Sequence, residues 1–358
     1  MPRKKLTRSR FILAASVLGL IFFSVVLLVF LKKDNIYWKD APMSKVQEQK
    51  ISAWITEWQW VSGLDDMQQL GDRIDSLQMF AAYFNEQDQL YFTKEMNEAM
   101  PQILNITGNN GLTDVTLTVV NDRFDGQGKV VQKDPELVTR LVATKESRKQ
   151  HIDQLVDAVN RHGFGGLEID YEQISNKDWK NVCLFYKELY ARLDGEGKTL
   201  RIVLEPKTKI GSVPLPKGPQ YVMMAYNLYG THSGPGPKAD FNLITDLAKK
   251  MKKLSGEPVI ALSLGGFDWS AAGDVKALTE KQASKLVQSS LSIPVRDQDS
   301  GSLHFKYKDE NGNQHTVWYA DEETLSQWMN AAAKAGISNI ALWRLGEVGD
   351  STLNKLNP

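Results

Sequence analysis

The chain has 358 residues, of which 42% are hydrophobic and 24% charged, values ordinary for a globular protein with one large domain or two smaller ones. Its formal net charge is zero, but seven basic residues precede the first acidic one and conceal a net charge of −7 over residues 34–358. This excess of acidic residues argues against nucleic acid as a partner.

Residues 11–31 form an uncharged, almost wholly apolar run, FILAASVLGLIFFSVVLLVFL. As a helix the run would be about 31 Å long, enough to cross a bilayer. It is longer than the apolar core of a signal peptide, roughly 7–15 residues, and no convincing cleavage site follows it. A buried core helix is the alternative, but the run has no polar face. The sequence therefore predicts an uncleaved transmembrane signal anchor.

The flanking charges predict how this anchor is oriented. Five basic residues precede the run and two follow it directly. Because basic residues favour the cytoplasmic side, residues 1–10 are expected in the cytoplasm and everything after the run outside the membrane. Residues 32–48 are polar and are expected to form a stalk, which leaves residues 49–358 as one folded domain.

Within residues 49–358, short apolar runs alternate with helical patterns. One such pattern, residues 147–163, begins with Ser147 as a helix cap and ends at Gly163. Eight strands alternating with helices favour a (β/α)8 barrel; a doubly wound open sheet is the alternative, but no GxGxxG motif follows a strand. The expected strands are residues 51–58, 76–84, 115–120, 164–172, 200–206, 221–227, 259–267 and 337–346.

One segment interrupts the alternation. Residues 302–320, SLHFKYKDENGNQHTVWYA, alternate with period two on both sides of Asn311-Gly312, a strong signal for a tight hairpin turn. We therefore expect a small β-hairpin insertion at about residues 291–320, between the seventh and eighth barrel strands. The only cysteine, Cys183, cannot form an intrachain disulfide and is expected to be a small buried hydrophobe in an apolar helix.

The fourth expected strand, GFGGLEIDYE at residues 163–172, has an acid at every second position. Alternate residues of a strand share a face, so Glu168, Asp170 and Glu172 are expected to point into the barrel and the apolar residues between them toward the helices. Carboxylates roughly 7 Å apart in a low-dielectric interior repel one another, which should raise at least one pKa. A half-exposed edge strand with its polar face in water is the alternative.

A carboxyl group with a raised pKa is suited to act as a general acid near neutral pH. Glu172 is the last of the three acids and therefore nearest the C-terminal mouth, where barrel active sites lie. The five histidines show no close ligand spacing, so the sequence predicts no metal site, and it predicts no cofactor.

Three motifs in this order resemble those of the family 18 glycoside hydrolases, the chitinase-like (β/α)8 barrels. The family carries DxxDxDxE on the fourth strand, Met-x-Tyr-Asp on the sixth and a tryptophan on the eighth. The insertion, and WYADEETLSQW after it, look like the subgroup of bacterial spore-cortex and cell-wall lytic enzymes. The matching positions are Gly165, Glu168, Asp170 and Glu172, then Met224, Tyr226 and Asn227, and finally Trp343.

The resemblance implies a role for each of these residues. Glu172 would protonate the glycosidic oxygen while the 2-acetamido oxygen of the substrate attacks the anomeric carbon, so that configuration is retained. Asp170 would hold the acetamide group, with Tyr226 bonded to its oxygen. Asn227 and Met224 would line the same subsite, and Trp343 would stack under the sugar.

Three positions depart from the family pattern. Gly165 replaces the first aspartate of the motif, Glu168 replaces the second, and Asn227 replaces a carboxylate. Fewer neighbouring negative charges should raise the pKa of Glu172 less, which would slow the reaction or shift its pH optimum. Trp54 and Trp269 are further candidates for contact with sugar, although barrel packing explains Trp54 equally well.

The sequence thus predicts a retaining glycosidase anchored through residues 11–31, with its catalytic domain outside the membrane in a bacterial cell envelope. The expected substrate is a β-linked N-acetylglucosamine-containing polysaccharide, either peptidoglycan or an exopolysaccharide, and no protein partner is indicated. Two alternatives remain open: a carbohydrate-binding barrel with weak or no activity, suggested by Gly165, Glu168 and Asn227, and a membrane-tethered scaffold in an envelope assembly complex.

Overall fold

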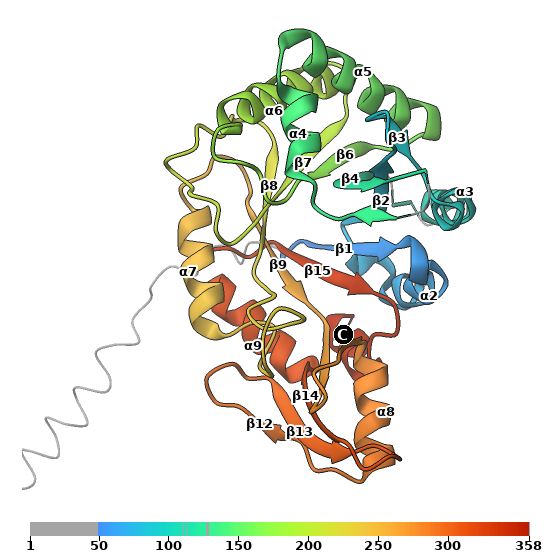
Figure 1. The fold of residues 1–358 in the computed structure, drawn as a ribbon, viewed down its shortest axis with the longest axis vertical. Coiled ribbons are helices and arrows are strands. Elements are labelled where there is room, and N and C mark those ends of the chain that lie inside the picture. Colours follow the sequence, from blue (N-terminus) through green and yellow to red (C-terminus); the bar gives the residue numbers. More distant parts are fainter. Residues whose placement is uncertain (1–48, 110, 113, 127–128, 358) are drawn as a thin grey trace, which may run out of the picture. The chain divides into compact units, whose positions relative to one another are not determined.

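The computed structural model describes residues 49–357, apart from residues 110, 113, 127 and 128 (Figure 1). The anchor predicted at residues 11–31 and the stalk predicted at 32–48 lie outside the described residues. Among the described helices, none is both long and apolar enough to cross a membrane.

The centre of the described domain is a closed barrel of eight parallel strands. In order around the barrel, neighbouring strands pair in parallel, and the pairs β2–β4 and β15–β1 complete the ring. Two short strands, β3 (Leu90–Tyr91) and β5 (Val130–Val131), extend β2 and β4 as antiparallel hairpins. The barrel strands are β1 (Ile51–Thr56), β2 (Ser76–Phe84), β4 (Val115–Phe124), β6 (Gly166–Asp170), β7 (Thr199–Leu204), β8 (Gln220–Met224), β9 (Val259–Ser263) and β15 (Ile340–Leu345).

The predicted (β/α)8 barrel is therefore confirmed, although some strand ends differ. The first strand stops at Thr56 because Glu57–Gln59 forms a 3-10 turn, η1. The run expected as one strand at 259–267 divides, since the backbone turns at Gly265, whose φ is +64°. A Cβ at Gly265 would lie 2.2 Å from the carbonyl oxygen of Leu278, so only glycine fits at the point where the chain leaves the barrel.

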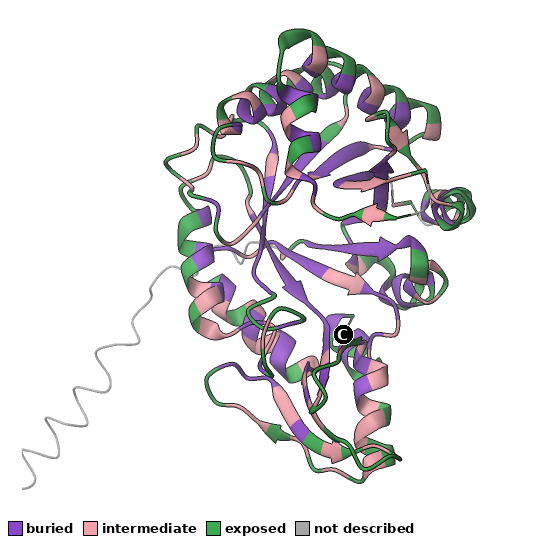
Figure 2. Ribbon diagram, in the orientation of Figure 1, coloured by how far each residue is buried: buried purple, intermediate pink, exposed green. Residues whose placement is uncertain are grey.

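Helices surround the barrel and bury their apolar faces against it, while their outer faces are exposed (Figure 2). The structure also shows where α5 begins. Its cap is Thr144, whose Oγ1 accepts from Ser147 N, while Ser147 Oγ accepts from Thr144 N, so the predicted cap at Ser147 is wrong by three residues. The helices are α2 (Trp60–Leu70), α3 (Lys94–Asn109), α4 (Pro135–Val142), α5 (Lys145–His162), α6 (Trp179–Asp194), α7 (Phe241–Met251), α8 (Glu280–Ser290), α9 (Glu322–Lys334) and α10 (Asp350–Leu356), with a second 3-10 turn, η2 (Gly71–Arg73).

The insertion is larger than the predicted hairpin. The turn at Asn311-Gly312 does join two antiparallel strands, but these belong to a five-stranded sheet in the order β11-β10-β14-β13-β12. The insertion starts at Gly265 rather than near residue 291, and α8 packs on the sheet over a small apolar core of its own (Figure 1). Its strands are β10 (Gly265–Ser270), β11 (Val275–Leu278), β12 (Val295–Arg296), β13 (Leu303–Lys308) and β14 (Gln314–Ala320).

Cys183 is buried in α6, as predicted, and burial raises the pKa of its thiol to about 11. A thiol with so high a pKa stays protonated near neutral pH, so Cys183 packs as a small hydrophobe.

Candidate active site

The alternation predicted for β6 is present. Leu167, Ile169 and Tyr171 belong to the main core with the helices, and Tyr171 Oη lies 2.8 Å from His151 Nε2. The acids between them face the barrel interior. β6 pairs with β4 on one side and with β7 on the other, so the alternative of an edge strand is excluded.

Glu168 is the deepest of the three acids and is fully buried. Its carboxylate accepts hydrogen bonds from Trp54 Nε1 at 2.6 Å, Thr118 Oγ1 at 2.8 Å and Arg201 Nε at 2.9 Å. Arg201 is itself buried and also donates to Ser52 and Gln220. A buried carboxyl group is tolerated when it is paired and hydrogen-bonded, and Arg201 with Trp54 and Thr118 supplies those partners beneath the site.

Asp170, one layer closer to the mouth, is the least satisfied of the acids. Its Oδ1 is buried and has no hydrogen-bond partner among the described residues. Burial raises the pKa of Asp170 well above its ordinary value, and the charges of Glu172 and Glu168 raise it further. A buried oxygen without a partner is available to a substrate group that can donate a hydrogen bond.

Glu172 lies just beyond the C-terminal end of β6. Its backbone is held by Asn121, which accepts from Glu172 N at 2.9 Å and donates to Glu172 O at 3.0 Å. Lys133 Nζ lies 2.7 Å from each carboxylate oxygen. Burial raises the pKa of Glu172, the Lys133 charge opposes that shift, and the net direction is upward. The electrostatics therefore suit a proton donor, although Lys133 restrains it.

Aromatic side chains form the opposite side of the site. The Trp343 ring is nearly parallel to that of Tyr226, with centroids 6.4 Å apart and 16° between the planes, and it meets Phe80 edge-on at 4.9 Å. Tyr226 is buried, and burial raises the pKa of its hydroxyl, which stays protonated and able to donate. Asn227 follows in a left-handed conformation, with φ of +61°, and is exposed.

These groups share one pocket of about 330 Å³ at the C-terminal mouth of the barrel. Six residues predicted from the sequence line it: Asp170, Glu172, Met224, Tyr226, Asn227 and Trp343. A second pocket, also of about 330 Å³, adjoins it and shares Asn227 and Trp343. We refer to the two pockets together as the cleft, since Asn227 and Trp343 line both of them.

Three predicted substrate-binding residues do not line these pockets. Trp54 and Glu168 bond to each other beneath the site, because both lie within barrel strands below the mouth. Trp58, in the turn beyond β1, lines the pocket instead and is 53% exposed. Trp269 is buried in β10, where its Nε1 donates to the carbonyl oxygens of Gly230 and Ser233, so it secures the loop after β8.

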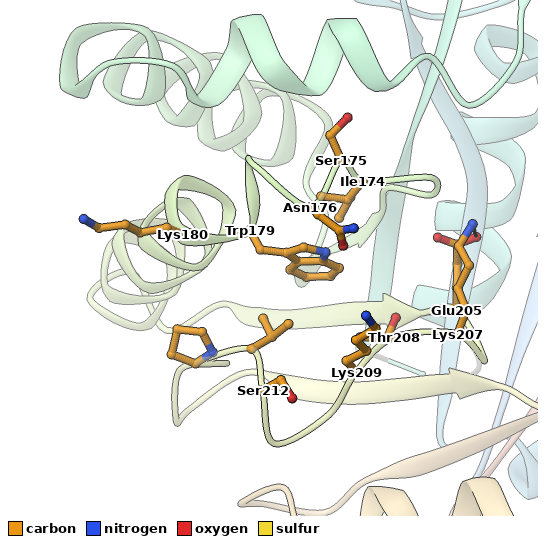
Figure 3. Close-up of a pocket in the computed structure, with 12 residues that line it drawn as sticks. Ile174, Ser175, Asn176, Trp179, Lys180, Glu205, Lys207, Thr208, Lys209 and Ser212 are labelled. Carbon is orange, nitrogen blue, oxygen red and sulfur yellow. Dashed lines mark ion pairs between the residues drawn. The ribbon is translucent and has the colours of Figure 1, made fainter.

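A third cavity, of about 710 Å³, lies beside the mouth between the segments that follow β6 and β7 (Figure 3). The Trp179 ring projects into it between these two segments, while Lys180 points away. Glu205, at one end of this cavity, accepts from Gln173 N at 2.8 Å and pairs with Lys207 at 3.0 Å. Its charge raises the pKa of Glu172, so this cavity and the acid pocket are electrostatically connected.

Several residues of the site were not identified from the sequence. Arg201 had a usable signal, since it is the one charged residue in the apolar run LRIVL. Asn121 had a weaker one, its place at the end of a strand. Lys133 had no signal in the sequence, because only the folded course of the segment after β5 brings its side chain to Glu172.

Comparisons with known proteins identify the family and the fold of this chain. The family model described as Glycosyl hydrolases family 18 matches residues 132–347. An uncharacterized glycosylase of Bacillus subtilis (strain 168), YvbX, is 26% identical in an alignment 233 residues long that covers 61% of this chain and 68% of that protein. A cortical fragment-lytic enzyme of Bacillus anthracis is 24% identical over 59% of this chain, and the match spans only 53% of that enzyme.

Among solved structures, the Bacillus cereus spore cortex-lytic enzyme SleL matches with a TM-score of 0.74 and 20% identity, over 86% of this chain and 73% of that one. A chitinase from Chromobacterium violaceum ATCC 12472 matches with a TM-score of 0.72 and 18% identity, over 86% and 98%. At these identities the structural matches establish the fold alone.

Proposed function

This chain belongs to family 18 of the glycosyl hydrolases, and from that membership we propose that it is a retaining glycosidase of the bacterial cell envelope. Its substrate is a β-linked, N-acetylglucosamine-containing polysaccharide, peptidoglycan or an exopolysaccharide. The observation that carries the proposal is that one pocket brings Glu172 and Asp170 opposite Tyr226 and Trp343. The names of the Bacillus relatives favour a cell-wall glycan.

The reaction follows from this arrangement. An N-acetylglucosamine unit stacks on Trp343, and Glu172 donates its proton to the glycosidic oxygen as the bond from that oxygen to the anomeric carbon breaks. The acetamido oxygen of the same sugar attacks that carbon from the opposite face. The acetamide nitrogen donates to Oδ1 of Asp170, which has no hydrogen-bond partner among the residues described in the structure. The carboxylate of Asp170 stabilises the positive charge that develops on the ring so formed. Water, deprotonated by Glu172, then opens the ring, and configuration is retained.

The residues beneath and beside the site support a second candidate function. Glu168 is committed to Arg201, and Gly165 provides no acid, so neither can readily pass a proton toward Asp170. Lys133 also favours the ionised form of Glu172, which cannot donate. These features favour a barrel that binds the glycan and turns it over slowly or not at all.

An assay of residues 34–358 separates the two candidates. The protein is incubated with peptidoglycan and with N-acetylglucosamine oligosaccharides, and product masses and reducing ends are identified. We expect cleavage that Glu172→Gln abolishes and that Glu146→Gln, a matched change at an exposed position of α5, leaves intact. Removing the substrate N-acetyl groups should also stop cleavage. Glycan binding by both the unaltered protein and Glu172→Gln, without turnover by either, would establish the binding barrel instead.

We also propose that residues 11–31 anchor the enzyme with its barrel outside the cytoplasmic membrane. The support is the length and apolarity of that run and its flanking charges. Protease added to intact spheroplasts should degrade the barrel of the full chain and spare a cytoplasmic reporter fused before residue 1. A barrel protected from the protease would refute this orientation.

A further inference from the structure

The second pocket of the cleft lies between the mouth of the barrel and the insertion sheet. It continues from the first pocket past Asn227 and Trp343, and it is bounded by the end of β9, by β11 and by the segment after β15. A polysaccharide with one unit on Trp343 would therefore place a neighbouring unit in this second pocket. The charged side chains that line this second pocket therefore help to determine which polysaccharide can bind there.

Lys238 is one of three cations that line this pocket; the others are Arg344 and the exposed Lys276. Lys238 Nζ donates to Ser263 Oγ at 3.0 Å and to the carbonyl oxygen of Leu264 at 2.8 Å, and it lies 5.0 Å from the centroid of the Phe267 ring. No carboxylate of the described residues lies within 4.0 Å of it. An ammonium group carries three N–H donors, so one remains for a ligand.

Arg344 provides a second cation on the same pocket. Its Nη1 donates to Thr56 Oγ1 at 3.2 Å and to Gln59 Oε1, and its guanidinium lies 5.4 Å from the centroid of the Trp58 ring. It too forms no ion pair with any carboxylate in the part of the chain that the structure describes. Its partners are neutral, so its charge is not cancelled by direct contact.

The two acids of the pocket are bonded to other groups. Glu280 accepts from Thr352 Oγ1 at 2.7 Å and from Gly349 N at 3.0 Å. Glu347 accepts from Gln282 Nε2 at 2.8 Å and from Thr279 Oγ1 at 3.0 Å. Neither carboxylate reaches Lys238. Burial, helped by the Arg344 charge, lowers the pKa of Lys238 to about 7, which shows that the protein itself destabilises this cation.

We propose that the second pocket binds a carboxylate carried by the sugar next to the one on Trp343, with Lys238 and Arg344 as its partners. This inference rests on the proposed glycosidase function and narrows its substrate to acidic polysaccharides. A carboxylate would accept a hydrogen bond from the remaining N–H of Lys238 and neutralise two partly buried cations that form no ion pair within the described part of the chain. A muramic acid lactyl group and a uronic acid both carry this carboxylate, whereas a chitin-like polymer carries none.

The test compares substrates with and without the negative charge on this carboxyl group. We would measure kcat/KM for a soluble oligosaccharide alternating N-acetylglucosamine and N-acetylmuramic acid, and for the same oligosaccharide with its carboxyl groups methyl-esterified. The unaltered full chain should prefer the free acid by about tenfold or more, the factor associated with one hydrogen bond to a charged group. An oligosaccharide alternating N-acetylglucosamine and glucuronic acid distinguishes the two sources of carboxylate.

Lys238→Met should reduce this preference toward one, while Lys253→Met should leave it unchanged. Lys253 is an exposed lysine just after α7, and its replacement removes the same charge outside the cleft. Equal rates on the acid and the ester with the unaltered enzyme, or a preference that survives Lys238→Met, would overturn the inference. The ester comparison needs no variant, so it holds even if Lys238→Met folds poorly.

Failure of the glycosidase function would look different, because no substrate would be cut. The same acid and ester ligands are therefore also titrated by calorimetry into Glu172→Gln, where preference is measured without turnover. Tighter binding of the acid by about tenfold supports the pocket assignment whether or not the barrel is active, and equal binding refutes it.

Discussion

Replacing Lys133 by methionine is expected to move the alkaline limit of activity to higher pH. The alkaline limb of kcat/KM against pH reports the pKa of the essential acid in the free enzyme, which we assign to Glu172. The positive charge of Lys133 stabilises the ionised carboxylate and so lowers this pKa. Without that charge, Glu172 keeps its proton to higher pH, and the limb shifts upward.

The size of the shift follows from the contact. Lys133 Nζ lies 2.7 Å from the carboxylate oxygens of Glu172, and the two side chains are 40% and 18% exposed. Unit charges 4 Å apart interact by about 4 kcal/mol near a protein surface and by about 1 kcal/mol in water. Because Lys133 is well exposed, solvent screening favours the lower part of that range, about 1–2 kcal/mol, which corresponds to roughly one pH unit.

The assay is the full pH profile of kcat/KM on a soluble N-acetylglucosamine oligosaccharide. Lys94→Met is the matched control, since Lys94 is 83% exposed on α3 and its replacement removes the same charge away from the pocket. An alkaline limb that stays in place in Lys133→Met, or moves to lower pH, would show that Glu172 is not the limiting acid. A shift of the same size in Lys94→Met would show only a change in overall charge.

Three further predictions concern other residues of the barrel. Arg201→Met should lower the free energy of unfolding by about 3–5 kcal/mol, because the buried carboxyl group of Glu168 would lose its charged partner. Urea titration measures this free energy, and a loss below about 1 kcal/mol would contradict a stabilising role of the ion pair. Trp343→Ala should reduce kcat/KM at least about tenfold through lost stacking, and unchanged kinetics would rule out a sugar on this ring. Burial raises the pKa of the Glu57 carboxyl from 4.5 to about 7, so the folded state binds this proton more tightly than the unfolded state. The free energy of unfolding, measured by urea titration, should therefore fall by up to about 3 kcal/mol between pH 4.5 and 7. The same dependence on pH in Glu57→Gln would refute this.

Much of the fold could be predicted because it depends on local patterns. Eight apolar runs separated by helical periodicity allow few arrangements other than a parallel barrel. The alternation in residues 166–172 assigned each side chain to a face, since successive strand residues must point opposite ways. The insertion was underestimated because β10 begins at Gly265, directly after the apolar run of β9, so its first residues were assigned to that run, and because β11 has only four residues.

The candidate site could be predicted only in part. Residues carried on strand ends, such as Glu172, Tyr226 and Trp343, were found because the C-terminal ends of barrel strands converge. Trp54 and Trp269 do not line the two pockets at the mouth, which the sequence could not show because a tryptophan in a strand can pack in the core or face the cleft equally well. Whether such a tryptophan packs in the core or faces the cleft depends on how far it lies below the mouth of the barrel. That distance depends on the register between neighbouring strands.

The sequence alone determined the barrel, the inward direction of three acids and the order of the motifs, because strand periodicity and chain order are local properties. The tertiary structure decided how those acids are charged. Arg201 on β7 pairs with Glu168, and Lys133 reaches Glu172 from the segment after β5. Lys238, beside the insertion sheet, pairs with no carboxylate of the residues that the structure describes. Electrostatic energies depend on distance and burial in three dimensions, so residues far apart in the chain set the pKa of the proton donor and the charge of its cleft.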